Sequence, residues 1–343
     1  MSGAASLADR LDRRIADEGP IPVSVYVDAA LYDADAGFYT AGGGRAGRRA
    51  DFLTAPEVGP LFGAVLARAV DSWWDDAGRP DRFVVEEWGA GPGTLARTIV
   101  AAAPEVLVAG ALRWVQVERA ASQRDLHLEH GALASVGPGD VNERVDVVIA
   151  NELLDNLPFD VIERADDGWR EVRVGPRDDT GRFTLVSGGA ASGPESEGIG
   201  LRLPVASAAG AWVDDVRQRA AHVIALDYGA ADAELLARDG AWLRTHVAHE
   251  GTADWLRDPG SCDITIDVPI DRLPVTDTMS TQAAFLRRHG IDELVEEGRR
   301  VWEASASVGD LAALKARSRV READALLDPA GMGAFTVLEW RGS

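Results

Sequence analysis

The sequence of 343 residues predicts an α/β fold: a mostly parallel sheet with helices on both faces, a helical N-terminal extension and an inserted antiparallel hairpin. Three observations support this prediction. Short apolar runs alternate with helical patterns after residue 80, a glycine-rich loop follows the first run, and polar–apolar alternation interrupts the rhythm between about 160 and 205. We therefore expect a helical lid segment over 1–80, packed on a core over 81–343 that carries an insertion at about 160–205.

The N-terminal extension contains a helix-start signature. Thr54 and Glu57 are separated by three positions, with a proline between them, which is typical of a capping box. Apolar residues then recur at helical spacing over 61–74. One face of the helix that follows this start should therefore be buried.

The core alternates expected strands with expected helices. The strands are predicted at 83–86, 113–117, 145–150 and 222–226, and the helices at 94–103 and 121–130. Alternating apolar and polar residues at 169–174 and 183–186 flank a turn-forming segment and indicate the hairpin. A late edge strand is expected at 335–340, after a charged helical region at 292–328.

Composition excludes several classes of protein. No run approaches the ~20 apolar residues of a membrane-spanning helix, and the charged N-terminus lacks the apolar stretch of a secretory signal. The net charge of −21 disfavours general nucleic-acid binding and suits either a basic partner or plain solubility. Cys262 is the single cysteine, which fits a cytoplasmic protein. Exposed-looking tryptophans leave a homodimer open.

The glycine loop Glu87-Trp88-Gly89-Ala90-Gly91-Pro92-Gly93-Thr94 follows the first core strand. Glycines allow a ligand to approach the backbone closely. Their alternate spacing differs from the G-x-G-x-x-G of dinucleotide-binding proteins. Glu118, which ends the second strand, is placed to accept hydrogen bonds from the two hydroxyls of a ribose. Together these features favour an adenosine-type cofactor; the alternatives are a simple tight turn, an exposed strand end at Glu118, and a turn-capping role for Glu87.

Matching segments extend along most of the chain and identify a family. They are Gly37-Phe38-Tyr39, Asp51 to Glu57, Leu61-Phe62-Gly63, Glu87 to Leu95, Val117-Glu118, Ala150 to Asp155 with Pro158, Leu226 to Gly229, Thr281-Gln282 and Phe285-Leu286. With these segments in this order, the chain resembles the MidA-type methyltransferases, whose mitochondrial members assist complex I assembly by methylating an arginine. The chain departs from the family at Ala50, Gly59 and Pro92, where glycine, serine and arginine are common.

The resemblance implies a Rossmann-like class I methyltransferase fold and S-adenosyl-L-methionine as the cofactor. It implies cofactor-binding roles for Asp51, Phe52, Thr54, Glu87, Gly89, Ala90, Gly91, Gly93, Glu118 and Asn151. The segment after the third strand faces the methyl acceptor, so Asn151, Glu152 and Asp155 are the candidate catalytic residues. Carboxylates suit the planar fork of donors that an arginine presents. The alternatives are a helix-start role for Thr54 and Glu57 and a structural role for Asp155. Asp227 and Tyr228 end the fourth strand and are expected to line the same cleft; the alternative for Tyr228 is a packed aromatic ring with its hydroxyl satisfied.

No metal site is expected. His127 and His130 are three positions apart, as are His246 and His249, but no cysteine pair or third ligand accompanies either pair. Histidines on a charged helix are usually solvated. The sequence thus predicts a methyltransferase with an arginine-bearing protein as substrate; the alternatives are a small-molecule methyltransferase and a non-catalytic assembly factor that binds the same cofactor.

Overall fold

The computed structural model describes residues 5–41, 54–141, 143–196, 198–238, 240–246, 253–305 and 311–342. The chain forms two compact units that interleave along the sequence. The antiparallel unit comprises Met1–Arg45, Leu153–Asp215 and Tyr228–Val275, and the α/β unit comprises Ala46–Glu152, Val216–Asp227 and Thr276–Ser343. The expected segments 1–80 and 81–343 each contribute residues to both units.

The α/β unit is built on a seven-stranded sheet of order β15-β16-β10-β5-β2-β3-β4. Its strands are β2 (Phe83–Trp88), β3 (Leu112–Val117), β4 (Leu133–Val136), β5 (Val145–Asn151), β10 (Ala220–Asp227), β15 (Thr278–Thr281) and β16 (Thr336–Arg341). Strands β4, β3, β2, β5 and β10 are parallel, as the alternation predicts. Strand β16 pairs antiparallel with both β10 and β15. The prediction of an edge strand at 335–340 is therefore wrong in its position, because β15 covers the outer side of β16.

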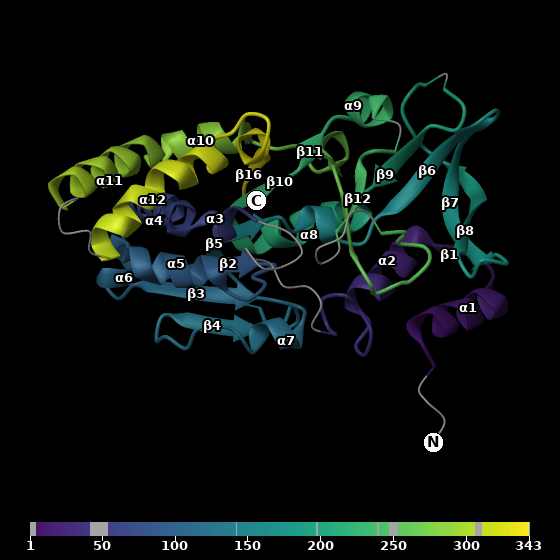
Figure 1. Cartoon of the computed structure of the whole chain (residues 1–343), viewed down its shortest axis with the longest axis horizontal. Coiled ribbons are helices and arrows are strands. Elements are labelled where there is room, and N and C mark those ends of the chain that lie inside the picture. Colours follow the sequence, from purple (N-terminus) through teal and green to yellow (C-terminus); the bar gives the residue numbers. More distant parts are fainter. Residues whose placement is uncertain are drawn as a thin grey trace. The chain divides into compact units, whose positions relative to one another are not determined.

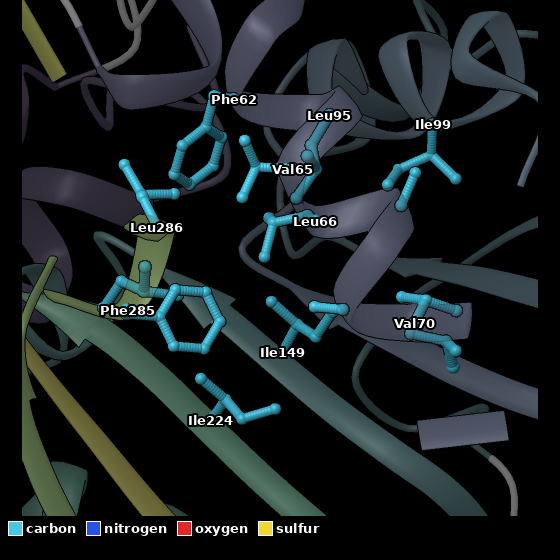
Figure 2. Close-up of a cluster of buried hydrophobic side chains, with 14 of the residues drawn as sticks. Phe62, Val65, Leu66, Val70, Leu95, Ile99, Ile149, Ile224, Phe285 and Leu286 are labelled. Atoms are coloured by element: carbon cyan, nitrogen blue, oxygen red, sulfur yellow. The ribbon is translucent and has the colours of Figure 1, made fainter. Parts of the chain in front are cut away.

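The α/β unit also contains helices, most of which contribute apolar side chains to one buried cluster against this sheet. They are α3 (Ala55–Val58), α4 (Pro60–Asp76), α5 (Thr94–Ala102), α6 (Glu105–Val108), α7 (Ala121–Arg124), α10 (Gln282–Arg288), α11 (Ile291–Ser305) and α12 (Leu311–Leu326), followed by the 3₁₀ turn η3 (Met332–Ala334). Figure 2 shows Phe62 and Leu66 of α4 and Phe285 of α10 above Ile149 of β5 and Ile224 of β10, all buried. The helical spacing over 61–74 is confirmed as the buried face of α4.

A glutamate distant in sequence completes the start of α4. Gly59 precedes this helix and has no side chain with which to cap it. Glu322 of α12 takes this role, because its Oε2 accepts the buried Leu61 N–H at 2.8 Å. A Cβ built on Gly59 would collide with the Glu322 carboxyl group, so the absence of a side chain at position 59 makes room for the cap.

One helical prediction needs correction, and another is confirmed. The helix expected at 121–130 ends at Arg124 as the single turn α7. Leu126 and Leu128 beyond it are exposed, so no buried apolar face sustains a longer helix. The charged region at 292–328 forms the two helices α11 and α12, which lie side by side (Figure 1).

The antiparallel unit contains the predicted hairpin within a larger sheet. Its elements are α1 (Leu7–Glu18), β1 (Ile21–Pro22), α2 (Val23–Tyr32), η1 (Leu154–Asn156), β6 (Asp160–Ala165), β7 (Gly168–Arg177), β8 (Phe183–Ala191), β9 (Arg202–Val205), β11 (Gly229–Ala230), α9 (Asp232–Ala237), β12 (Leu243–His246), β13 (Asp263–Ile266), β14 (Val268–Pro269) and η2 (Ile270–Arg272). Helix α8 (Ser207–Arg219) crosses from this unit into the other. Strand β7 pairs with β1, β6 and β8, all antiparallel. The hairpin is confirmed as β7 and β8, and the N-terminal helices as α1 and α2.

Buried aromatic side chains hold the antiparallel unit together. Tyr26 of α2 makes an edge-to-face contact with Phe183 of β8, with ring centroids 5.3 Å apart. The Tyr26 hydroxyl donates to the carbonyl of Trp255 at 2.8 Å, so the polar end of this buried ring is satisfied. Among the described helices, none is long and apolar enough to cross a membrane.

Candidate cofactor and acceptor site

The glycine loop lies at the carboxyl edge of the parallel strands. The ends of β2, β3, β5 and β10 are adjacent there, which is the edge where ligands bind in open α/β sheets. Gly89, Gly91 and Gly93 have φ angles of 68°, 52° and 76°, a left-handed conformation that favours glycine. A Cβ built on Gly91 would have no neighbour within 4 Å among the described residues, so the space beside this residue is open.

Glu118 and the glycine loop are joined directly. The Gly91 N–H donates to Glu118 Oε2 at 2.9 Å, and the Ala120 N–H donates to Oε1 at 2.7 Å. Burial raises the pKa of the Glu118 carboxyl group, while these backbone donors oppose the shift. Ala90 is buried within the loop. A carboxylate beside an open glycine backbone suits a ligand with ribose hydroxyls.

Glu87 lies inside the sheet rather than at its surface. Its side chain is 5% exposed, and its Oε2 accepts the indole N–H of Trp114 at 2.7 Å. Burial raises the pKa of Glu87 to about 8, although the Trp114 hydrogen bond and the charge of Arg97 oppose the shift. The group is therefore protonated in the folded protein at neutral pH. A role in direct contact with the cofactor stays a prediction for Glu87.

Two hydrogen bonds to glutamate side chains connect the described part of the segment 51–57 to neighbouring elements. One glutamate is Glu152, and the other is Glu57 of the segment itself. Helix α3 begins at Ala55 as the signature predicts, but the Thr54 side chain makes no capping hydrogen bond. Glu152 Oε1 accepts the Ala55 N–H at 3.1 Å instead, and Glu57 Oε1 accepts the Thr94 hydroxyl at 2.5 Å. The helix start is therefore confirmed, but its side-chain partners are Glu152, which follows β5, and Thr94 at the start of α5. Asp51 and Phe52 lie outside the described residues.

Asn151 and Glu152 follow the end of β5. Glu152 adopts a φ of 52°, which a non-glycine residue rarely does and which often marks a functional site. Its backbone N–H donates to the Leu226 carbonyl at 2.8 Å, which ties this conformation to the end of β10. The Asn151 amide donates to Glu152 Oε1 at 3.1 Å, and the buried Oδ1 of Asn151 has no hydrogen-bond partner in the described ranges.

The remaining acidic candidates divide between the two units. Asp155 lies buried in η1 of the antiparallel unit. There, burial together with the charges of Asp263 and Asp155 raises the pKa of Tyr39 well above its ordinary value. Asp227 is buried at the end of β10 in the α/β unit, and Tyr228 belongs to the antiparallel unit, where Arg244 stacks over its ring.

His127 contacts the glycine loop, which the sequence did not indicate. Its Nε2 lies 2.8 Å from the Gly91 carbonyl oxygen and its Nδ1 lies 2.8 Å from the Ser135 hydroxyl. The expectation of a solvated helical histidine is wrong, because α7 ends before it. No local sequence signal marks this contact, because Gly131 stands just after the expected helix end at 130 and does not indicate an earlier one. Within the described part of the chain, no group of three or more potential ligands is arranged to hold a metal ion.

Named relatives support a methyltransferase. The chain is 28% identical to protein arginine methyltransferase NDUFAF7 of Xenopus laevis over 85% of this chain and 76% of that protein. It is 27% identical to the Danio rerio protein of the same name over 85% and 78%. The protein arginine methyltransferase NDUFAF7 homolog of Drosophila melanogaster is 30% identical over 50% of this chain. The aligned region spans 45% of that relative, slightly less than half of its length.

Solved structures give the fold and the cofactor. A COG1565 superfamily member from Burkholderia thailandensis bound to S-adenosyl-homocysteine has a TM-score of 0.80 and 29% identity, covering 98% of this chain and 91% of that one. A native crystal structure of a COG1565 superfamily protein from that organism gives a TM-score of 0.79 at 27% identity with the same coverage. The expected Rossmann-like class I methyltransferase fold is thereby confirmed, as is S-adenosylmethionine as the cofactor.

A family profile covers the site described above. Residues 65–287 match Methyltransf_28, the profile of S-adenosyl-L-methionine-dependent methyltransferases. The matched residues include the glycine loop, Glu118 and the segment after β5. The chain therefore belongs to this family and is an S-adenosylmethionine-dependent methyltransferase.

Proposed function

We propose that this enzyme transfers a methyl group from S-adenosylmethionine to an arginine side chain of a protein. The observation that carries the proposal is Glu152, a carboxylate held in a strained backbone conformation where β5 ends. The names of the relatives, which are protein arginine methyltransferases, support the same acceptor. The net charge of −21 favours a basic protein partner.

The residues of the α/β unit fit the cofactor. The open space beside Gly91 admits a ligand against the backbone, and the Glu118 carboxylate beside it is suited to two ribose hydroxyls. The unsatisfied Oδ1 of Asn151 is an acceptor for a donor group of the cofactor. When bound, S-adenosylmethionine supplies a methyl group on a positively charged sulfur that is already activated for transfer.

Because the methyl donor is already activated, the protein mainly has to align the acceptor nitrogen with the methyl group. A guanidinium carries a fork of N–H donors that two carboxylate oxygens can hold in one plane. In our proposal the two carboxylate oxygens of Glu152 hold this fork and direct one nitrogen toward the cofactor, while the role of Asp155 in the acceptor site stays a prediction from the sequence. Orienting the reactants in this way accelerates methyl transfer through proximity, and the protein forms no covalent bond with either reactant.

The acceptor is tested by transfer of a labelled methyl group from S-adenosylmethionine into cell lysate. We expect label in the protein fraction and methylarginine after acid hydrolysis. Label in small molecules would favour the alternative substrate class. Cofactor binding without any labelling would favour a non-catalytic assembly factor. Label on lysine or another residue would contradict the arginine assignment while leaving protein methylation standing.

The role of Glu152 is tested by Glu152→Gln. Glutamine keeps an oxygen that can accept the Ala55 N–H, so the start of α3 should survive the change. We expect turnover to fall by about tenfold or more, because a charge-assisted contact to the acceptor is lost, while affinity for S-adenosylmethionine stays nearly constant. The matched control is Glu303→Gln on the exposed surface of α11, which should change neither quantity. A loss of cofactor affinity in Glu152→Gln would assign Glu152 to the cofactor instead.

A further inference from the structure

His127 and the glycine loop form one hydrogen-bonded assembly within the α/β unit. We propose that His127 is a positioning residue, which holds Gly91 in the conformation that receives S-adenosylmethionine. The inference rests on the proposed assignment of the loop to the cofactor. It adds a residue outside the glycine motif that sets cofactor affinity.

Two side chains fix Gly91 from opposite ends of the residue. On the amino side, the Gly91 N–H donates to Glu118 Oε2 at 2.9 Å. On the carboxyl side, the Gly91 carbonyl oxygen lies 2.8 Å from His127 Nε2. The space into which a side chain at position 91 would project is open, because a Cβ built on Gly91 has no neighbour within 4 Å among the described residues. Both peptide groups that flank the Gly91 Cα are thus fixed, while the side on which a ligand would lie stays open.

The hydrogen bonds determine the tautomer of His127. A carbonyl oxygen only accepts, so Nε2 carries the proton and donates it to Gly91. In the neutral ring Nδ1 is then an acceptor, and it receives the Ser135 hydroxyl of β4 at 2.8 Å. Ser135 therefore anchors the ring to the sheet and holds the donating nitrogen toward the loop.

The surroundings keep the ring neutral and packed. Burial lowers the pKa of His127, the hydrogen bond to the Gly91 carbonyl opposes this shift, and the positive charges of Arg97 and Arg124 add to it. The ring also supports the last glycine of the loop, because a Cβ built on Gly93 would lie 3.0 Å from His127 Cδ2. The loop consequently rests on a fixed, uncharged donor rather than on a mobile surface side chain.

Loss of this contact should affect binding rather than chemistry. Without the donor, the Gly91 carbonyl is released and the loop gains conformations that the cofactor must suppress when it binds. The dissociation constant and the KM for S-adenosylmethionine should rise together. The kcat at saturating cofactor should stay unchanged, because His127 touches neither the acceptor segment nor Glu152 in the described contacts.

Two amide substitutions separate the two ring nitrogens. In His127→Gln the side-chain amide nitrogen can take the place of Nε2 and donate to Gly91. In His127→Asn the shorter side chain places its amide near Nδ1 and cannot reach the loop. By calorimetry we expect His127→Asn and His127→Ala to bind S-adenosylmethionine about threefold to tenfold more weakly, the range of one net hydrogen bond. We expect His127→Gln to stay within about twofold of the wild type.

Two controls complete the test. His130→Ala removes a neighbouring exposed histidine that accepts the Ala132 N–H, and it should leave affinity unchanged. Equal affinity of His127→Asn and the wild type would overturn the inference, as would equal weakening in His127→Gln and His127→Ala. Gly91→Val tests the underlying assignment separately, because its side chain would fill the open space. If Gly91→Val binds normally, the loop is not the cofactor site and the proposed function fails at that point; if it abolishes binding while His127→Asn has no effect, only the present inference fails.

Discussion

The buried carboxyl group of Glu87 should make the stability of this enzyme depend on pH in an unusual direction. In the folded protein its pKa is raised to about 8 from an ordinary value of 4.5, chiefly by burial. The folded protein therefore keeps a proton that the unfolded chain releases between these pH values. Stability from this group is complete below pH 4.5, declines as pH rises toward 8, and is constant above that.

The magnitude follows from the interval between the two pKa values. About 3.5 pH units at about 1.36 kcal/mol each give a loss of about 5 kcal/mol, of which about 3 kcal/mol has developed by pH 7. Glu87→Gln removes the titration while its amide oxygen can still accept the Trp114 indole N–H. Between pH 4.5 and 8.5 the free energy of unfolding of the variant should therefore rise by about 4 kcal/mol relative to that of the wild type.

Urea unfolding of both apo proteins at a series of pH values, followed by tryptophan fluorescence, measures this difference. Groups common to the two proteins cancel in the comparison. Glu303→Gln is the control, because an exposed carboxylate should give a constant offset over the same range. A constant offset for Glu87→Gln as well would refute the conclusion that Glu87 is protonated in the folded enzyme.

Three further substitutions test the packing, each by the free energy of unfolding in urea. Glu322→Ala leaves the buried Leu61 N–H without its partner and should cost about 1–3 kcal/mol; an unchanged midpoint would show that α4 does not need this cap. Phe285→Ala empties a fully buried position of the core and should cost about 3–5 kcal/mol, and a loss below 1 kcal/mol would mean that the site collapses readily. Tyr39→Phe removes the hydroxyl 2.9 Å from Asp263 Oδ1 and should cost about 1–2 kcal/mol, whereas a more stable variant would contradict the assigned hydrogen bond.

The parts of the fold that were predictable are those with local signals. The strand at 83–88, the glycine loop and the helix after it each carry their own periodicity or turn residues, and all three appear where expected. The pairing of the loop with Glu118 was also predictable, because parallel strands place their carboxyl ends at one edge.

Contacts between distant segments were not predictable in the same way. The signature at Thr54 correctly marked a helix start, but the partner of that start is Glu152, 97 residues further along. His127 reaches Gly91 across 36 residues, and no local pattern reports such a contact. The pairing of β1 with β7 is similar, since a two-residue strand at Ile21–Pro22 has no periodicity to detect.

The carboxylate that caps α4 affects how the chain can fold while it is being synthesised on the ribosome. Leu61 is synthesised 261 residues before the side chain that satisfies its amide, and β16, which flanks β10, is made later still. The start of α4, the longest helix of the nascent α/β unit, therefore lacks its cap until Glu322 has been synthesised and has left the ribosome. Chains that stop short of Glu322 should remain dependent on chaperones, even though they already contain every residue assigned to the methyl donor.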